Sequence, residues 1–568
     1  MTPSSGNRSA PPWAAFSSAP ASRLAPSLLK DIPLLVLGLA LFYGLMSLTR
    51  YWAGPVSDQP VIHLEPSALP EYALFSVARL AVAYAFSLAI TLVYSYIAAH
   101  NPRAERVLIP LLDTLQSIPV LSFLPPVMVA MVALFPSRQL GVELGSILLI
   151  TTGQVWNMTF SVYSSMKNVP REMLEAAQVY RLSWYQKFVQ IELPHSAIGL
   201  IWNSMMSVAG GWFFLMACEM FVLGNRDLRL PGLGSYLQTA ANAGDTRAIL
   251  WGVFAMIAVI VAMDQAIWRP LIAWSEKFKF EQVEASSKVR SPILHLLRNS
   301  RLLVYAGHTV VSPLREAIGI HFARENTTQP PVPAKRPWRG FPVRILLAVM
   351  LAGAIYAVIK MGVMVAGISA VEWREILRGA GATFLRVEFV LLIAAIAQPL
   401  AQIAASVPAT ALFPIVLLAL IRVGGGLGVG SLILLLLGTQ WYVLFNVIAG
   451  ASAIPTDLRE VCDVFHCSRL ERWRKLLLPG IFPYLITGLV TASGGAWNAS
   501  IVAEYFRFHG QTITTIGLGS IISGATDTGN FPVLLGGTIV MSLIVVTVNR
   551  LVWRRLYALA SGRFSMNG

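Results

Sequence analysis

The stretch that decides the fold is EAAQVYRLSWYQKFVQIELP, residues 175–194. It is polar and charged, whereas the 568-residue chain as a whole is 55% hydrophobic and only 12% charged. Soluble domains contain about a quarter charged residues, and an apolar block of roughly 20 residues is long enough to cross a bilayer. The chain is therefore predicted to be an all-α polytopic membrane protein that keeps this polar segment outside the membrane.

The apolar blocks predict about twelve transmembrane helices, six on each side of a polar middle stretch. The predicted spans lie near residues 33–49, 73–98, 107–134, 142–166, 197–222 and 248–272, and then near 342–366, 379–397, 404–423, 428–451, 481–506 and 533–557. We predict four regions on this basis: a disordered N-terminus (1–30), a first unit (31–275), a linker (276–340) and a second unit (341–568).

The net charge of +15 follows from Lys and Arg residues that fall mostly between the apolar blocks. Such residues favour the cytoplasmic side of a membrane, so the charge indicates topology rather than nucleic-acid binding. The middle stretch, both termini, and residues 167–196 and 452–480 are then predicted to be cytoplasmic. Arg226, Arg229 and Arg247 are exceptions, because they fall in a loop assigned to the outside. The linker could be an amphipathic helix on the inner leaflet or a partly ordered connection.

An internal repeat relates the two halves of the chain. GQVWNMTF at 153–160 is matched by GTQWYVLF at 438–445, and GLGS at 232–235 recurs at 517–520, with a constant offset of 285 residues. The chain is therefore predicted to contain two copies of one six-span unit. Upstream, SIPVLSFLPP at 117–126 matches SVPATALFPI at 406–415. The second copy is compressed near 386–399 if Arg79 corresponds to Arg386.

The polar stretch is predicted to form two short helices separated by a turn. The first helix begins after Pro170 and is expected to stop near Arg181, and Ser183 is expected to cap the second. Ser183 and Gln186 have the spacing of a capping box, as do Ser468 and Glu471 in the second copy. Leu193 and Pro194 are expected to end the second helix and lead into the next span.

The order Glu-Ala-Ala, a turn, and then Ile-x-Leu-Pro resembles the EAA loop of permeases from binding-protein-dependent ABC importers. The matching residues are Glu175, Ala176, Ala177, Ile191, Leu193 and Pro194 in the first copy, and Glu460, Leu478 and Pro479 in the second. Arg181 and His466 replace the family's glycine. A side chain in a left-handed turn costs about 1 kcal/mol, so either the turn is altered or the side chain contacts a partner or lipid head groups.

The resemblance implies two tandem type I (MetI-like) permease units. The flanking features, which are the Pro-rich third span, the Trp–Glu pair after the loop and GLGS, are similar to those of the nitrate, sulfonate, taurine and bicarbonate branch. The resemblance implies two copies of an ABC ATPase subunit, on which the two loops would dock, and a periplasmic or lipid-anchored solute-binding protein. It also implies that the chain lies among the lipids of a bacterial inner membrane. The cargo is expected to be a small anion or a small polar organic solute. ATP would be hydrolysed by the separate subunit, and neither nucleic acid, a cofactor nor a metal is expected on this chain.

Other functional classes are less well matched by the sequence. A secondary transporter or channel built from tandem repeats is the alternative, but such proteins often carry charged residues at mid-membrane, and this chain has few. A membrane-embedded enzyme would need a cluster of catalytic or metal-binding residues, and no such cluster or nucleotide-binding motif is found in the sequence.

Two pairs of repeat-related residues are candidates for the pathway. Glu219 and Glu504 fall late in apolar spans and could either line the pathway or brace the helix bundle. Trp212 and Trp497 could contribute to the pathway wall, although core packing is the favoured interpretation.

Overall fold

The computed structural model describes residues 61–136, 139–223, 226–278, 292–300, 307–324, 341–396, 427–454, 456–508 and 511–563, with a few further residues, mainly between 39 and 54. This part of the chain is almost entirely helical. The predicted spans 33–49 and 404–423 lie largely outside the described residues, as do most of the compressed region and much of the linker.

The described part of the first half consists of helices and one short hairpin. They are α2 (Leu69–His100), α3 (Pro102–Ser117), α4 (Leu124–Leu134), α5 (Leu140–Lys167), α6 (Arg171–Val179), α7 (Trp184–Lys187), α8 (Leu193–Glu219), β1 (Val222–Leu223), β2 (Arg226–Asp227), α9 (Leu233–Ala243), and α10 (Thr246–Met263) continuing into α11 (Arg269–Ser275).

The described part of the second half repeats this order from α5 onward. Its elements are α15 (Phe341–Ala366), α16 (Ala370–Ile396), α19 (Leu427–Ala453), α20 (Thr456–Val464), α21 (Arg469–Glu471), α22 (Leu478–Ala503), β3 (Tyr505–Phe508), β4 (Gln511–Thr514), α23 (Leu518–Thr528), and α24 (Phe531–Val548) continuing into α25 (Arg554–Arg563). Between the halves lie α12 (Pro292–Asn299), beside α11, and α14 (Ser312–Arg324), beside α7.

The described residues include six continuous helices that are long and apolar enough to cross a membrane, or up to eight spans if each of two bent pairs counts as one. Helix α5 matches the predicted span 142–166 but is not among the six. It packs against both α2 and α8, so much of its surface faces protein rather than lipid. Thr151, Gln154 and Thr159 are accordingly buried on it. A helix shielded in this way can carry polar residues that a lipid-facing helix cannot.

The predicted single span 107–134 is wrong in one respect, because it is broken. Helices α3 and α4 meet at an angle of 87° across a short break that contains the 3₁₀ turn η3 (Val120–Phe123). Pro119 lies in this break with an extended backbone (φ −62°, ψ 116°). A proline has no amide proton for the helix and disfavours a helical conformation in the residue before it, which accounts for the interruption.

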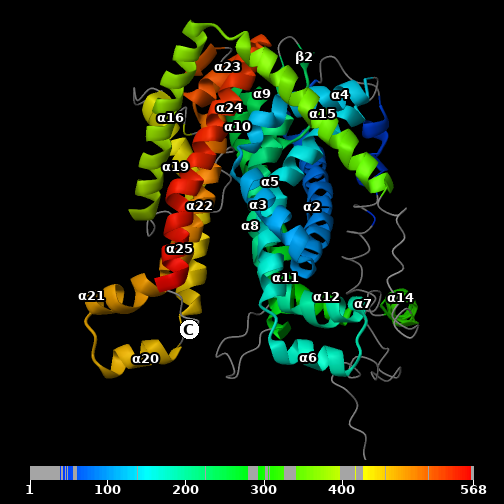
Figure 1. Ribbon diagram of the computed structural model, residues 1–568. Coiled ribbons are helices and arrows are strands. Elements are labelled where there is room, and N and C mark those ends of the chain that lie inside the picture. The colour runs from blue at the N-terminus through cyan, green and yellow to red at the C-terminus, as the bar shows by residue number, and fades with distance from the viewer. Residues whose placement is uncertain are drawn as a thin grey trace, which may run out of the picture.

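A second bend separates α15 and α16, which meet at 103°. The sequence predicts two ordinary spans here, and the helices exist, but they do not run as an antiparallel pair. In Figure 1, α15 runs obliquely across the upper part of the molecule while α16 follows the long axis of the second half. Gly367, Ile368 and Ser369 lie between the two helices, and Ser369 caps α16 through Glu372.

The prediction that Leu193 and Pro194 end a helix is also wrong. Helix α7 continues through the π-helical segment η4 (Phe188–Glu192) into α8, so one helix runs from Trp184 to Glu219. The wider π turn accommodates a proline that would otherwise clash with the carbonyl group four residues earlier. The second copy does the same through η10 (Arg472–Leu477), just before Pro479.

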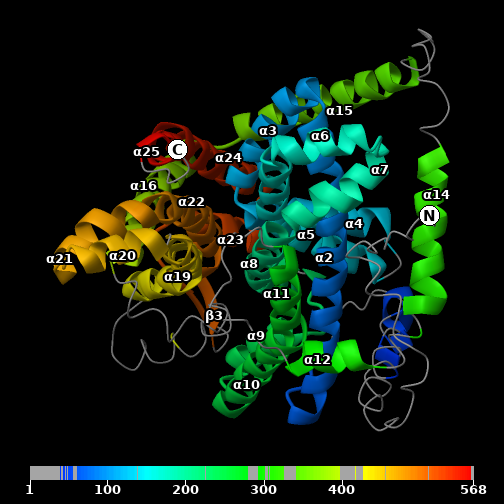
Figure 2. The same ribbon diagram turned by 90° about the horizontal axis from the view of Figure 1, so that it is seen from below.

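The two halves pack side by side and share one hydrophobic core, to which Trp212 and Val208 contribute from the first half and Trp497 and Val443 from the second. Helices α6 and α20 lie at one end of the molecule, and the hairpins with α9 and α23 lie at the other (Figure 1). We call these the loop end and the hairpin end. Viewed along the long axis, α6 with α7 and α20 with α21 lie on separate sides (Figure 2).

Candidate functional site

The two helix–turn–helix loops have the same local geometry. Ser183 accepts a hydrogen bond from the amide of Gln186 (3.2 Å) and its own amide donates to the Gln186 side chain (2.9 Å). Ser468 and Glu471 form the same capping box. Arg181 and His466 have φ values of 50° and 49°, so the left-handed turn is kept in both copies without a glycine. Of the two explanations offered by the sequence, the altered turn is therefore excluded.

Each loop exposes a pair of apolar residues just before its left-handed turn. Val179 and Tyr180 are 80% and 77% exposed, and their repeat counterparts Val464 and Phe465 are 73% and 76% exposed. Side chains of this size are normally covered. The carbonyl of Ala177 accepts from the amide of Leu182 (2.9 Å), and Ala177 is buried, so the turn folds back on its helix and leaves the apolar pair at the outer corner.

The remaining predicted loop residues fall into two groups. Glu175, Ala176 and Glu460 are exposed on α6 and α20. Ile191 lies in the π-helical segment, and Leu193, Pro194, Leu478 and Pro479 form the first turns of the long helices α8 and α22. The two groups of the motif therefore sit at opposite ends of each loop.

The second loop also contains two neighbouring thiols. Cys462 is buried in a small apolar cluster with Leu476 and Ile481, against which Cys467 packs. A hydrogen bond with Cys467 and burial both raise the pKa of the Cys462 thiol.

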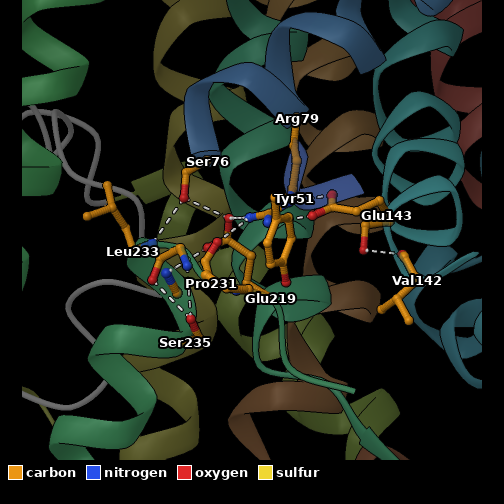
Figure 3. A network of polar contacts seen from close by, with 12 residues as sticks. Tyr51, Ser76, Arg79, Val142, Glu143, Glu219, Pro231, Leu233 and Ser235 are labelled. Atoms are coloured by element: carbon orange, nitrogen blue, oxygen red, sulfur yellow. Dashed lines mark hydrogen bonds and ion pairs between the residues drawn. The ribbon is translucent and has the colours of Figure 1, made fainter. Parts of the chain in front are cut away.

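Glu219 belongs to a buried polar network at the hairpin end (Figure 3). Arg79, on α2, donates to Glu219 (2.8 Å) and makes a two-point contact with Glu143 on α5 (2.7 Å for both bonds). All three side chains are fully buried. A buried charge is tolerated when it is paired and hydrogen-bonded in this way, so the contacts of Glu219 are those of a brace.

The GLGS motif completes the network around Glu219. The amide of Gly234 donates to the Glu219 carboxylate (2.8 Å), and Ser76 links that carboxylate (2.7 Å) to the amide of Leu233 (3.0 Å). A β-carbon at Gly232 would collide with the same carboxylate, so this position requires glycine. The motif thus ties α9 to α2 and α8.

The second half builds the same network around Glu504, with one difference. Thr383 and Leu518 occupy the places of Ser76 and Leu233, and Gly519 donates to Glu504 (2.8 Å). Arg386 pairs with Glu504 and donates to the carbonyl of Ile516 (3.1 Å), as Arg79 does to that of Pro231 (2.7 Å). These contacts support the match of Arg79 to Arg386. Gly428 stands where Glu143 would be, so Arg386 has one carboxylate partner among the described residues.

Two cavities follow one another along the interface between α8 and α22. The central cavity has a volume of about 540 Å³, and the hairpin-end cavity has a volume of about 410 Å³. On α8 the central cavity reaches Phe214 and the other begins at Ala217, while on α22 the boundary falls between Ala499 and Ile501. Both cavities are lined by residues of both halves.

The central cavity is lined mainly by apolar and aromatic side chains, among them Met205, Trp212 and Phe213. Its polar members are Tyr442 and Asn498 from the second half, and Gln265 with the Asp264–Arg269 ion pair from the first. Trp212 therefore borders this cavity, whereas Trp497 is fully buried in the core and borders neither cavity. Glu219 and Glu504 also line neither cavity.

The hairpin-end cavity has more polar groups, including the Asp227–Arg229 ion pair and the hydrogen-bonded Tyr505 and Asp527. Around it each half reaches across to the other: β3 packs beside α9, and β1 packs beside α23. The two halves therefore interlock at this end.

The brace was not predicted in full from the sequence. Arg79 and Glu143 carry the signal that could have found it, because each is an ionisable residue inside a predicted apolar span. The partner could not be read from the sequence, since the offset of 285 leads from Glu143 to a glycine.

Long apolar helices, a repeated unit of six predicted spans and cavities between the two repeats define a membrane permease. The family model described as the inner membrane component of binding-protein-dependent transport systems matches residues 91–264 and 380–559. The chain belongs to this family and contains two tandem copies of its domain.

Several permeases are similar to parts of the chain. A nitrate import permease protein of Leptolyngbya laminosa is 29% identical over 27% of this chain and 52% of its own length. A bicarbonate transport system permease protein of Synechocystis is 24% identical over 34% of this chain and 65% of its length. A Bacillus subtilis protein named for aliphatic sulfonates transport is 22% identical over 36% and 70%. The chain thus spans about half the length of the nitrate permease it matches.

Proposed function

We propose that this chain supplies both halves of the translocation pathway of an ATP-driven importer and that α6 and α20 are its two ATPase-coupling helices. The observation that carries the proposal is the exposed apolar corner that recurs at the same register in both halves, Val179–Tyr180 and Val464–Phe465. An amphipathic segment fixed in shape by capping boxes and a left-handed turn suits a groove on a partner protein. Glu175, Arg181, Glu460 and His466 surround these corners.

Two such corners imply two ATPase subunits, one for each half. ATP would be bound and hydrolysed on those subunits. The loop end would then face the cytoplasm of a bacterium, together with both termini, and the hairpin end would receive solute from a periplasmic or lipid-anchored binding protein. The long helices that begin at Leu193 and Leu478 run from the loops into the bundle, so rigid-body movement of a docked ATPase would reach the cavities directly.

The central and hairpin-end cavities are proposed as successive parts of the translocation pathway. The names of similar proteins suggest nitrate, an aliphatic sulfonate or bicarbonate as cargo, which are small anions or small polar organic solutes. The buried carboxylates of Glu143, Glu219 and Glu504 are held in hydrogen-bonded networks outside both cavities. The carboxylates that line the cavities are paired or hydrogen-bonded, Asp264 with Arg269, Asp227 with Arg229 and Asp527 with Tyr505, which reduces their repulsion of an anion.

The pairing of the ionisable groups also argues against a secondary transporter. Ion coupling in such proteins uses ionisable groups that are exposed to the pathway at mid-membrane. Arg79, Glu143 and Glu219 are paired with one another, fully buried and outside both cavities, and the Asp264 and Arg269 side chains that do line the central cavity form an ion pair.

The test is reconstitution of the full chain with its ATPase and binding protein in liposomes, followed by uptake of labelled nitrate, methanesulfonate or bicarbonate. We expect uptake of at least one of these to require ATP and the ATPase. Uptake that proceeds equally well without ATP or without the ATPase subunit would contradict the proposal.

A further inference from the structure

The break in the span formed by α3 and α4 contacts both halves of the molecule. Turn η3 packs against α5 of its own half and also against α22, which belongs to the other half. The amide of Leu121 donates to the side-chain carbonyl of Asn498 (3.1 Å), and the bond is buried. The two residues are 377 positions apart in the sequence. A backbone group released by the break is thus satisfied by a side chain of the second half.

This bond also links a residue of one cavity to a residue of the other. Leu121 lines the hairpin-end cavity and Asn498 lines the central cavity, while the two cavities have no lining residue in common. The bond therefore lies at the boundary between them. Val120, Leu121 and Ser122 are all buried at this boundary, so the turn fills space rather than bordering open water on both sides.

The chemistry of the break supports a role beyond packing. An interrupted backbone at membrane depth is tolerated only where it is enclosed by protein or lines a cavity, because its amide and carbonyl groups need partners. The turn is kept compact by Ser122, whose amide and hydroxyl both donate to the carbonyl of Pro119 (3.2 and 2.6 Å). It is a pre-formed unit attached to the second half by one hydrogen bond that can break and form again.

The side chain that makes this attachment differs between the two halves. Phe213 stands at the position of Asn498 in the first half and cannot accept a hydrogen bond from a backbone amide. Asn498 is also oriented for this task, because its amide nitrogen donates to the carbonyl of Gly494 one turn earlier (2.9 Å) and leaves the oxygen directed at η3. Asn498 is thus a positioning residue that acts through the turn.

We propose that η3 is the gate between the hairpin-end cavity and the central cavity, and that the hydrogen bond from Leu121 to Asn498 holds this gate closed. This inference rests on the proposed use of the two cavities as a translocation pathway. When the two halves rock apart around α8 and α22, the bond is lost, η3 withdraws with the first half, and the cavities join.

The gate is tested by the passive permeability of liposomes that contain only the purified full chain, with potassium nitrate as the probe. In the presence of valinomycin, nitrate entry makes the liposomes swell, which light scattering records. Loss of a single buried hydrogen bond shifts an open–closed equilibrium by about five-fold. We therefore expect Asn498→Leu to raise the nitrate-dependent swelling rate by about five-fold over the wild type.

The matched control is Asn446→Leu. Asn446 also lies in a long helix of the second half and donates to the carbonyl four residues earlier (2.7 Å), but makes no bond to the first half among the described contacts. A second variant, Leu121→Ala, removes gate volume without touching Asn498, and Leu435→Ala removes equal volume from the buried core of α19. Swelling should rise in Asn498→Leu and Leu121→Ala, and remain at the wild-type rate in the two controls.

Wild-type swelling rates in both Asn498→Leu and Leu121→Ala would overturn the gate, as would equal increases in the controls. This measurement needs neither ATP nor partner subunits. Failure of the gate is therefore separable from failure of the proposed function, which is judged by ATP-driven uptake in the complete wild-type complex.

Discussion

Arg79 and Glu143 form a buried two-point ion pair in the first half, and the second half has Gly428 in place of Glu143. Arg79 is therefore held by two carboxylates and Arg386 by one within the described residues. Arg79 ties α2 to the end of α8, and Arg386 ties α16 to the end of α22. Each arginine also bonds to the segment after the hairpin of its half. The two halves share one design but differ in how firmly this tie is held.

The first prediction concerns this difference. We expect Arg79→Met to lower the stability of the purified chain by about 3–5 kcal/mol, because it leaves two buried carboxylates without their cation. Arg386→Met strands one carboxylate that keeps Thr383 and Gly519 as donors, so its effect should be smaller. Thermal unfolding in detergent measures both. Arg374→Met on the exposed face of α16 is the control and should leave the midpoint unchanged, and equal losses in the two variants would contradict the asymmetry.

The second prediction concerns docking of the ATPase. Replacement of Tyr180 or Phe465 by Ser removes an exposed aromatic ring that the proposal buries against a partner. Aromatic anchors at interfaces contribute at least about 1.4 kcal/mol each, so the affinity for the purified ATPase should fall about ten-fold or more. Equilibrium binding in detergent measures this effect.

Gln178→Ser is the matched control for this experiment, because Gln178 is equally exposed on α6 but is polar. The stability of the chain should not fall in any of the three variants, since none of the replaced side chains is buried. Unchanged affinity in both aromatic variants would remove the observation on which the proposed coupling helices rest.

The loops were also the part of the fold that the sequence predicted best, and the reason is local. Capping boxes, a proline at a helix start and a turn act within a few residues, so Ser183 with Gln186 and Ser468 with Glu471 could be recognised directly. The repeat offset carried this prediction to the second copy. The π-helical segments before Pro194 and Pro479 were missed, because a proline ends a helix in most settings and the compensating wider turn has no sequence signal of its own.

Features that depend on contacts between distant residues could not be predicted in this way. The prolines of SIPVLSFLPP were visible, yet nothing local indicates that the amide of Leu121 would bond to Asn498 in the other half. Nor could the sequence show that Arg79, Ser76 and Gly234 surround Glu219, the contacts that favour a bracing role over a pathway role.

The third prediction concerns Arg181, which adopts the left-handed conformation that glycine adopts most easily. We expect Arg181→Gly to keep the turn and to raise the stability of the chain slightly, by up to about 1 kcal/mol, because the strain of the β-carbon is removed. If the Arg181 side chain also contacts the ATPase, affinity in the same binding assay should fall. Arg171→Gly is the control, because it alters a right-handed position in the first turn of α6 and should lower the stability of the chain. A loss of stability in Arg181→Gly would contradict the prediction and show that the turn depends on the Arg181 side chain.

The last prediction concerns Tyr442, which lies between two glycines related by the repeat. A β-carbon at Gly495 would approach the Tyr442 ring to 2.8 Å, and one at Gly210 would approach its hydroxyl oxygen to 2.9 Å, whereas one at the neighbouring Gly494 would meet nothing within 4 Å. All three positions are in α8 or α22, and Gly210 and Gly495 line the central cavity with Tyr442. We therefore expect Gly495→Ala to displace the ring into the cavity and to reduce ATP-driven uptake several-fold, with Gly494→Ala close to wild type. Restoration of uptake when Gly495→Ala is combined with Tyr442→Ala would identify the ring as the obstruction. A loss of uptake in Gly494→Ala as large as in Gly495→Ala would contradict this prediction, because it would show that transport requires helix flexibility rather than room for Tyr442.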